Sequence, residues 1–185
     1  MTPAPLAQFM ASLFKSLPDE IVLLDPGAGI GILTSAFVEH AVRHVSKSTI
    51  HVHAYEVDAV MLRHLKTTME ECDSFCKQIG VDFQWHIHAE DFIEAGVQSL
   101  VYEYSLFGEK SQRYSHCIMN PPYRKIKSDS STRAQLQQIG IETSNLYTGF
   151  LAIAVHLLEA GGELVAIVPR SFCNGVYFKS FRKFF

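Results

Sequence analysis

Hydrophobic and polar residues follow two alternating patterns along the chain. Short apolar runs of strand length begin near residues 21, 50, 82, 115 and 163. Between these runs, apolar residues recur every three or four positions, which is typical of helices that pack against a sheet. The alternation predicts an α/β fold with a doubly wound, mostly parallel, Rossmann-like sheet.

The opening segment has the pattern of a capped amphipathic helix. Thr2 and Pro3 provide a cap and a favoured first-turn proline. The apolar residues at helical spacing are Leu6, Phe9, Met10, Leu13 and Phe14.

Towards the other end of the chain, we expect a long apolar helix to about Glu159. A turn at Gly161 and Gly162 should follow, and then a strand from Glu163 to Val168. The aromatic and basic segment from Tyr177 to Phe185 predicts the start of another helix.

The composition limits the function classes. The chain has 185 residues, of which 48% are hydrophobic and 19% charged, and this suits one packed domain. A formal net charge of −3 is unlike that of a stand-alone nucleic-acid-binding protein. No apolar run is long enough to cross a membrane and no leader pattern is present, so we expect a cytoplasmic protein with no membrane partner.

Cysteine and histidine spacings do not form a metal motif. Cys72 and Cys76 lie one helical turn apart, but nothing completes a zinc site, so free thiols are expected. His-x-His pairs occur at 51–53 and 86–88 without a cysteine or carboxylate at supporting spacing. We therefore predict no metal site.

The apolar run from His116 to Met119 ends in Asn120-Pro121-Pro122-Tyr123. Because prolines end a strand ladder, Asn120 should lie at the carboxyl end of a strand, where open parallel sheets bind ligands. The Asn120 side-chain oxygen and the Pro121 carbonyl form a rigid pair of acceptors beside the Tyr123 ring. Such acceptors can hold an amino group on a planar molecule and localise its nitrogen lone pair, which makes the nitrogen nucleophilic.

A glycine-rich turn follows the first strand. Asp25-Pro26-Gly27-Ala28-Gly29-Ile30-Gly31 leads from the strand into a helix, so backbone N–H groups can face a ligand. The glycine spacing does not fit a dinucleotide fingerprint, and the Gly-Lys-Ser/Thr of a phosphate loop is absent. The acidic Asp25 would repel a pyrophosphate and attract a cation. Glu56, at the end of the second strand, lies where a ribose-binding carboxylate is expected.

With these motifs in this order, the sequence resembles the class I S-adenosylmethionine-dependent methyltransferases that modify adenine N6 in DNA. The resemblance is to restriction-modification methylases of the gamma-type, Eco57I-like order, in which the cofactor-binding half comes first. It implies that Asn120, Pro121, Pro122 and Tyr123 are the catalytic residues and that the target adenine flips out of the duplex. The implied cofactor-binding residues are Thr2, Pro3, Asp25, Gly27, Ala28, Gly29, Glu56, Val57, Asp91, Phe92 and Phe150.

The resemblance also implies a role for each group of residues. Thr2, Pro3 and Asp25 would meet the methionine end of the cofactor. Glu56 would accept from the ribose and Val57 would cover the adenine. Asp91, with Glu90 competing for the role, would accept from the adenine amino group, and Phe92 and Phe150 would pack near the ring.

The resembled fold has seven strands, and the last two are not seen in this sequence. We therefore expect residues 1–185 to be a methyltransferase domain cut from a longer enzyme. Double-stranded DNA would bind mainly through a separate target-recognition domain, and a nuclease domain or subunit could be attached. The basic segment 124–133 is either a loop that contacts a nucleic-acid backbone or a solvated loop.

Other readings of the same tetrapeptide stay open. Related enzymes with this motif methylate a glutamine amide in translation release factors or guanine N2 in ribosomal RNA. A non-catalytic, cofactor-binding subunit is a third alternative.

Overall fold

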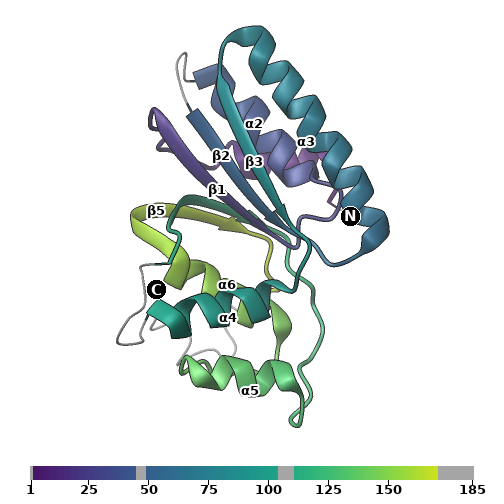
Figure 1. Cartoon of the computed structure of the whole chain (residues 1–185), viewed down its shortest axis with the longest axis vertical. Coiled ribbons are helices and arrows are strands. Elements are labelled where there is room, and N and C mark those ends of the chain that lie inside the picture. The colour runs from purple at the N-terminus through teal and green to yellow at the C-terminus, as the bar shows by residue number, and fades with distance from the viewer. Residues whose placement is uncertain (1, 45–48, 104–110, 171–185) are drawn as a thin grey trace.

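The computed structural model describes residues 2–44, 49–103 and 111–170 of the chain (Figure 1). Within them, five parallel strands form one sheet in the order β3-β2-β1-β4-β5. The strands are β1 (Glu20–Pro26), β2 (Thr49–Tyr55), β3 (Asp82–His88), β4 (Tyr114–Met119) and β5 (Leu158–Ala166). The helices are α1 (Ala4–Ala11), α2 (Ile32–His44), α3 (Ala59–Ile79), α4 (Phe92–Glu103), α5 (Ser131–Gln138) and α6 (Leu146–Leu157). The predicted α/β fold with its parallel sheet is confirmed.

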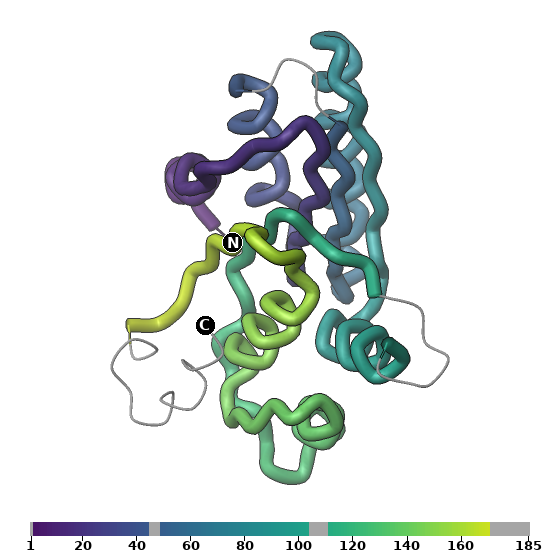
Figure 2. Tube along the Cα trace, turned by 90° about the vertical axis from the view of Figure 1, so that its left-hand side faces the viewer, coloured from purple at the N-terminus to yellow at the C-terminus, as the bar shows by residue number. Residues whose placement is uncertain are grey.

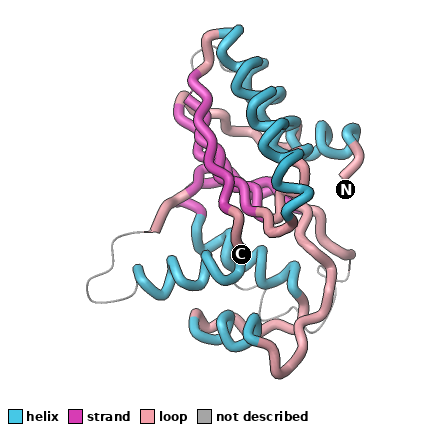
Figure 3. Tube along the Cα trace, turned by 45° about the vertical axis from the view of Figure 1, so that its right-hand side comes forward, coloured by secondary structure: helices cyan, strands magenta, loops and turns pink. Residues whose placement is uncertain are grey.

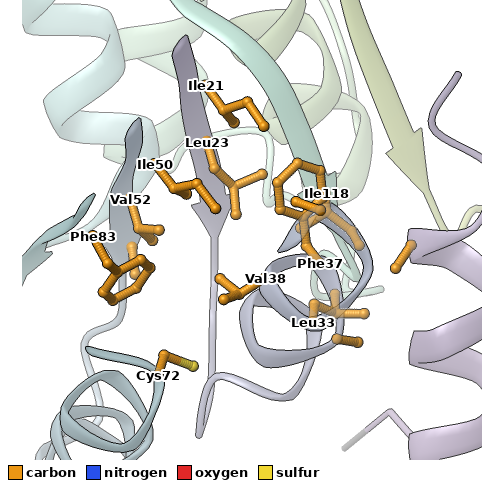
Figure 4. Close-up of a cluster of buried hydrophobic side chains, with 14 of the residues drawn as sticks. Ile21, Leu23, Leu33, Phe37, Val38, Ile50, Val52, Cys72, Phe83 and Ile118 are labelled. Carbon is orange, nitrogen blue, oxygen red and sulfur yellow. The ribbon is translucent and has the colours of Figure 1, made fainter. Parts of the chain in front are cut away.

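Helices cover both faces of the sheet. Figures 2 and 3 show α2 and α3 on one side of the strands and α4, α5 and α6 on the other. The first layer buries the alternating residues Ile50 and Val52 of β2 against α2 and α3, together with Ile21, Leu23 and the fully buried Phe37 (Figure 4). Each such large apolar side chain contributes roughly 1.5–3 kcal/mol on burial.

The second layer is centred on α6, whose residues from Leu146 to Ala154 are all buried. Its neighbour α4 approaches closely because Gly96 has no side chain; a Cβ there would overlap the Ile153 side chain. This close packing holds α4 against α6.

Helix α1 differs from the prediction in both its cap and its buried face. The Thr2 side chain does not cap it; Pro3 is the N-cap residue, and its carbonyl accepts from the backbone N–H groups of Leu6 and Ala7. Ala7, Met10 and Ala11 are buried, whereas Leu6, Phe9 and Leu13 are 39%, 59% and 46% exposed. The small alanines face the core because α1 packs closely against α2.

The Gly-Gly turn is also a correction. Helix α6 ends at Leu157, earlier than predicted, and β5 begins at the next residue. Gly161 and Gly162 lie inside β5, where the pairing shifts from Tyr114–Leu158 to His116–Glu163. A residue with positive φ suits such a bulge, and Gly161 has φ +85°. The predicted helix start from Tyr177 to Phe185 lies outside the described residues.

Within the described ranges, no helix is both long enough and apolar enough to cross a membrane.

Candidate active site

The carboxyl ends of the four adjacent strands β3, β2, β1 and β4 meet at one edge of the sheet, and two cavities open there. The larger holds about 280 Å³ and the smaller about 180 Å³. Gly27, after β1, and Asn120, after β4, line both cavities. The two spaces therefore share a wall made by the two motifs that the sequence singled out.

Most of the predicted site residues come together here. The larger cavity is lined by the predicted residues Gly27, Glu56, Val57, Asp91, Phe92, Asn120, Pro122 and Phe150, and by the competing candidate Glu90. The smaller is lined by Thr2, Gly27, Ala28, Gly29 and Asn120. Pro3, Asp25, Pro121 and Tyr123 are not on either lining.

Sequence reasoning missed several lining residues. Tyr55, Arg124 and Leu146 lie on the larger cavity and Ile30, Ile32 and Leu33 on the smaller. Ile30 lies in the glycine turn, and Ile32 and Leu33 begin the helix that follows it. Their closeness to the predicted cofactor turn was therefore the sequence signal that could have found them. Tyr55 precedes Glu56 and Leu146 begins α6, and both read as core residues from sequence alone.

The glycine turn is held by backbone hydrogen bonds. The N–H groups of Gly27 and Ala28 both donate to the Tyr55 carbonyl at 2.9 Å. Gly27 has φ +74°, a conformation that favours glycine. The turn packs so close to Phe150 that a Cβ added to Gly27 would lie 3.5 Å from that ring.

The Glu56 carboxylate is fixed by three backbone amides. Its Oε2 accepts from Gly29 at 2.9 Å, and its Oε1 accepts from Val57 and Asp58 at 2.8 Å each. Each carboxylate oxygen has further lone pairs for hydroxyl donors. Glu56 is thus tied to the glycine turn and presented to the larger cavity.

Asp25 lies beneath the glycine turn, fully buried. Its Oδ2 accepts from the Thr34 hydroxyl at 2.7 Å, while its buried Oδ1 has no hydrogen-bond partner among the described residues. Burial raises the pKa of Asp25 to about 7, and the Thr34 hydrogen bond opposes this only partly. An unpartnered, buried carboxylate oxygen fits a site that receives a cation nearby.

An acidic residue and an aromatic group form the far wall of the larger cavity. Asp91 Oδ1 accepts from the N–H groups of Ile93 at 2.8 Å and Glu94 at 3.1 Å, so it caps α4. Phe92 is buried between Tyr55 and Phe150, with ring centroids at 5.1 and 5.2 Å. The wall therefore combines a carboxylate with a platform suited to a planar ring.

Asn120 is hydrogen-bonded at both ends of its amide. Its Nδ2 donates to Thr2 Oγ1 at 3.1 Å, and its Oδ1 accepts from the Tyr123 hydroxyl at 2.7 Å. That hydroxyl also lies 2.9 Å from the Ile167 carbonyl. Tyr123 is 51% exposed, so part of its side chain is accessible to solvent.

Comparison with known proteins decides the family. Residues 32–185 match the Eco57I restriction-modification methylase family. The chain belongs to this family. The expected resemblance to Eco57I-like restriction-modification methylases is confirmed.

Two curated relatives agree with the match. The chain is 44% identical over 183 residues to the Type II methyltransferase M.PstI of Providencia stuartii, covering 99% of this chain and 35% of that protein. It is 42% identical over 184 residues to the Type II methyltransferase M.BsuBI of Bacillus subtilis. This match covers 98% of this chain and 35% of that protein. The chain thus spans about a third of the length of these relatives.

Solved structures agree on the fold. A putative class I S-adenosylmethionine-dependent methyltransferase from Listeria monocytogenes superposes with a TM-score of 0.69 at 16% identity, covering 100% of this chain and 51% of that one. A type I restriction-modification system methyltransferase subunit from Streptococcus thermophilus superposes with a TM-score of 0.63 at 18% sequence identity. The match covers 100% of this chain and 38% of that one. The chain therefore has the fold of these methyltransferases, and the name of the first includes the expected cofactor, S-adenosylmethionine.

Two histidines on neighbouring strands, His53 on β2 and His88 on β3, contact each other. His53 Nδ1 lies 3.1 Å from His88 Nε2, and burial, reinforced by neighbouring imidazoles, lowers the pKa of both to about 4. Among the described residues, no group of three or more histidine, cysteine or acidic side chains is arranged to hold a metal ion. Cys72, Cys76 and Cys117 are buried free thiols whose pKa values are raised by burial.

Asp25 gives a testable pH dependence of stability. Its pKa is raised from 3.8 to about 7, so the folded protein retains a proton that the unfolded chain releases between these values. This contribution to stability is complete below the lower value and is lost as the pH rises through 7. We predict that Asp25→Asn, which cannot ionise, gains stability relative to the wild type between about pH 5 and about pH 8, on the order of 3 kcal/mol.

Urea unfolding at the two pH values measures this difference. The exposed substitution Asp82→Asn is the control, and its difference from the wild type should stay nearly constant. A stability difference for Asp25→Asn that does not change with pH would contradict the assignment.

Proposed function

We propose that this chain binds S-adenosylmethionine and transfers its methyl group to the N6 amino group of a flipped-out adenine in DNA. The whole protein would act as the modification part of a restriction-modification system. The observation that carries the proposal is the position of Asn120. It lies in the wall between two cavities, and its amide oxygen accepts a hydrogen bond from the hydroxyl of Tyr123, whose side chain is half exposed.

The residues around both cavities fit the proposed cofactor. The smaller cavity, lined by Thr2 and the glycine turn, suits the methionine end. Asp25 comes just before that turn and has a buried carboxylate oxygen with no hydrogen-bond partner among the described residues. In the larger cavity, Glu56 accepts from the ribose hydroxyls. Asp91, or Glu90 next to it, accepts from the adenine amino group above the Phe92 ring. Pro3 is exposed and is the N-cap residue of α1, so its role is to connect Thr2 to the start of that helix.

The target side supplies acceptors without a strong base. When bound, the cofactor supplies an electrophilic methyl group on a sulfonium. Asn120 Oδ1 and the Pro121 carbonyl accept the two N–H groups of the target amine and favour a tetrahedral nitrogen. Tyr123 stacks on the flipped base. The proton leaves after the nitrogen has become cationic, so water can take it.

The segment after Tyr123 supports DNA as the substrate. Arg124 lines the larger cavity, and Lys125 pairs with Asn145 in a β-bridge next to the buried Ile126. The bridge holds the segment in place. Arg124, Lys125, Lys127 and Arg133 form no ion pair within the described part of the chain. Such cations, of which Arg124 lies on the cavity lining, can neutralise phosphates that flank a flipped nucleotide.

The longer protein would supply the remaining partners. Its relatives are about three times as long as this chain, which leaves room for a target-recognition domain that binds double-stranded DNA and for a nuclease. A glutamine amide or guanine N2 would also fit the acceptor pair. DNA has more support because both relatives are named Type II methyltransferases.

The role of Asn120 predicts a separation of binding from transfer. Asn120→Ala should lower the rate of methyl transfer to DNA by at least about 100-fold, because it removes an acceptor aimed at the reacting nitrogen. Its cofactor dissociation constant should change less than about 3-fold, a difference below about 0.7 kcal/mol. Radiolabel transfer to plasmid DNA and calorimetry measure the two quantities.

The exposed substitution Gln78→Ala on α3 is the control and should resemble the wild type in both assays. Retained transfer by Asn120→Ala would remove Asn120 from the chemistry.

The cations of the basic segment predict a salt-dependent effect. Lys125→Gln and Lys127→Gln should each raise KM for DNA and reduce the slope of log affinity against log salt by about one, because each removes one phosphate contact. The matched control is Lys66→Gln, since Lys66 is exposed and lies on α3 across the sheet. Filter binding over a range of salt concentrations measures the slopes. Equal slopes for all three variants would assign the segment to a solvated loop.

A further inference from the structure

The side chains of Thr2 and Asn120 join the start of the chain to the proposed catalytic tetrapeptide. Thr2 Oγ1 lies 3.1 Å from Asn120 Nδ2, although 118 positions separate them in sequence. Thr2 is only 8% exposed, and both residues line the smaller cavity. This contact was not expected from the sequence, where Thr2 was assigned to the cofactor and to capping α1.

The two ends of an asparagine amide have the same shape but opposite hydrogen-bonding character. A half-turn about the last side-chain bond exchanges an acceptor for a donor. For an amine to be held as proposed, the oxygen of Asn120 must face it and the NH₂ must point elsewhere. Some neighbouring group therefore has to accept from the NH₂.

Tyr123 does not hold the amide in one orientation. Its single hydroxyl proton has two acceptors within reach, Asn120 Oδ1 at 2.7 Å and the Ile167 carbonyl at 2.9 Å. If the proton goes to Ile167, the hydroxyl oxygen can accept from the amide instead. When a target amine takes the place at Oδ1, the Thr2 hydroxyl is the group among the described residues that continues to accept from the NH₂.

We propose that Thr2 is a positioning residue for Asn120, which accepts from its NH₂ and so turns its oxygen towards the target amine. The inference rests on the proposed function of Asn120. It adds that the residue lining the proposed methionine end of the site also orients the acceptor for the target. The orientation of the Asn120 amide then depends on Thr2, which also lines the smaller cavity.

The test compares Thr2→Val, which keeps the shape and loses the hydroxyl, with Thr2→Ser, which keeps the hydroxyl. At saturating cofactor and DNA, Thr2→Val should lower the single-turnover rate by about 10-fold or more, the effect of one lost hydrogen bond to a buried group. Thr2→Ser should stay within about 3-fold of the wild type. The control Thr67→Val changes an exposed threonine on α3 and should leave the rate unchanged.

A loss confined to the cofactor dissociation constant, with an unchanged saturated rate, would make Thr2 a cofactor contact only and would overturn the proposal. Failure of Thr2→Ser to restore the rate, in a protein whose melting temperature is unchanged, would also overturn it.

A second measurement does not depend on activity. The side-chain NH₂ signals of Asn120 are identified by nuclear magnetic resonance from their loss in Asn120→Ala. Thr2→Val should speed their hydrogen exchange with water by about 10-fold, and Thr2→Ser should not. Equal exchange in both variants would show that Thr2 does not hold the amide. Because this readout needs no methyl transfer, a wrong substrate assignment and a wrong role for Thr2 give different results.

Discussion

The parallel pairing of β1 with β2 on one side and β4 on the other is the constraint on which the site depends. It aligns Asp25 with Ala54 and Leu24 with Cys117, so the segments that follow these strands leave the sheet at the same edge. The glycine turn, Glu56 and Asn120 therefore meet at that edge. Burial of the strands between two helical layers keeps that register, because a slip would expose Ile21, Ile50 and their neighbours.

Backbone groups then do most of the fine positioning. The Tyr55 carbonyl accepts hydrogen bonds from two backbone N–H groups of the glycine turn. The Glu56 carboxylate accepts from three, one in that turn and two in the residues just before α3. These bonds connect β1 to β2 at the point where both cavities open. A site held by short, local hydrogen bonds needs little reorganisation when a ligand arrives, which is the condition for electrostatic catalysis. Asp25 adds a buried carboxyl that a neighbouring cation would favour in its charged form.

Much of this architecture follows from sequence. Strand positions, the glycine turn, Glu56 after β2 and Asn120 after β4 could be predicted because each depends on a local pattern of apolar, glycine and proline residues. Other features depend on packing between distant segments and left no local signal. Helix α1 packs closely against α2, and Phe9 and Leu13 are exposed. Gly161 lies at the bulge in β5, and Thr2 contacts Asn120 although the two are far apart in sequence.

The central claim is that an amide oxygen between two cavities directs methyl transfer to the amino group of adenine. The most direct measurement incubates the whole protein with S-adenosylmethionine and unmodified plasmid DNA, digests the DNA to nucleosides and identifies them by mass spectrometry. The account predicts N6-methyladenine as the methylated product. A methyl group on cytosine, or no methylated nucleoside although calorimetry shows the cofactor bound, would contradict it.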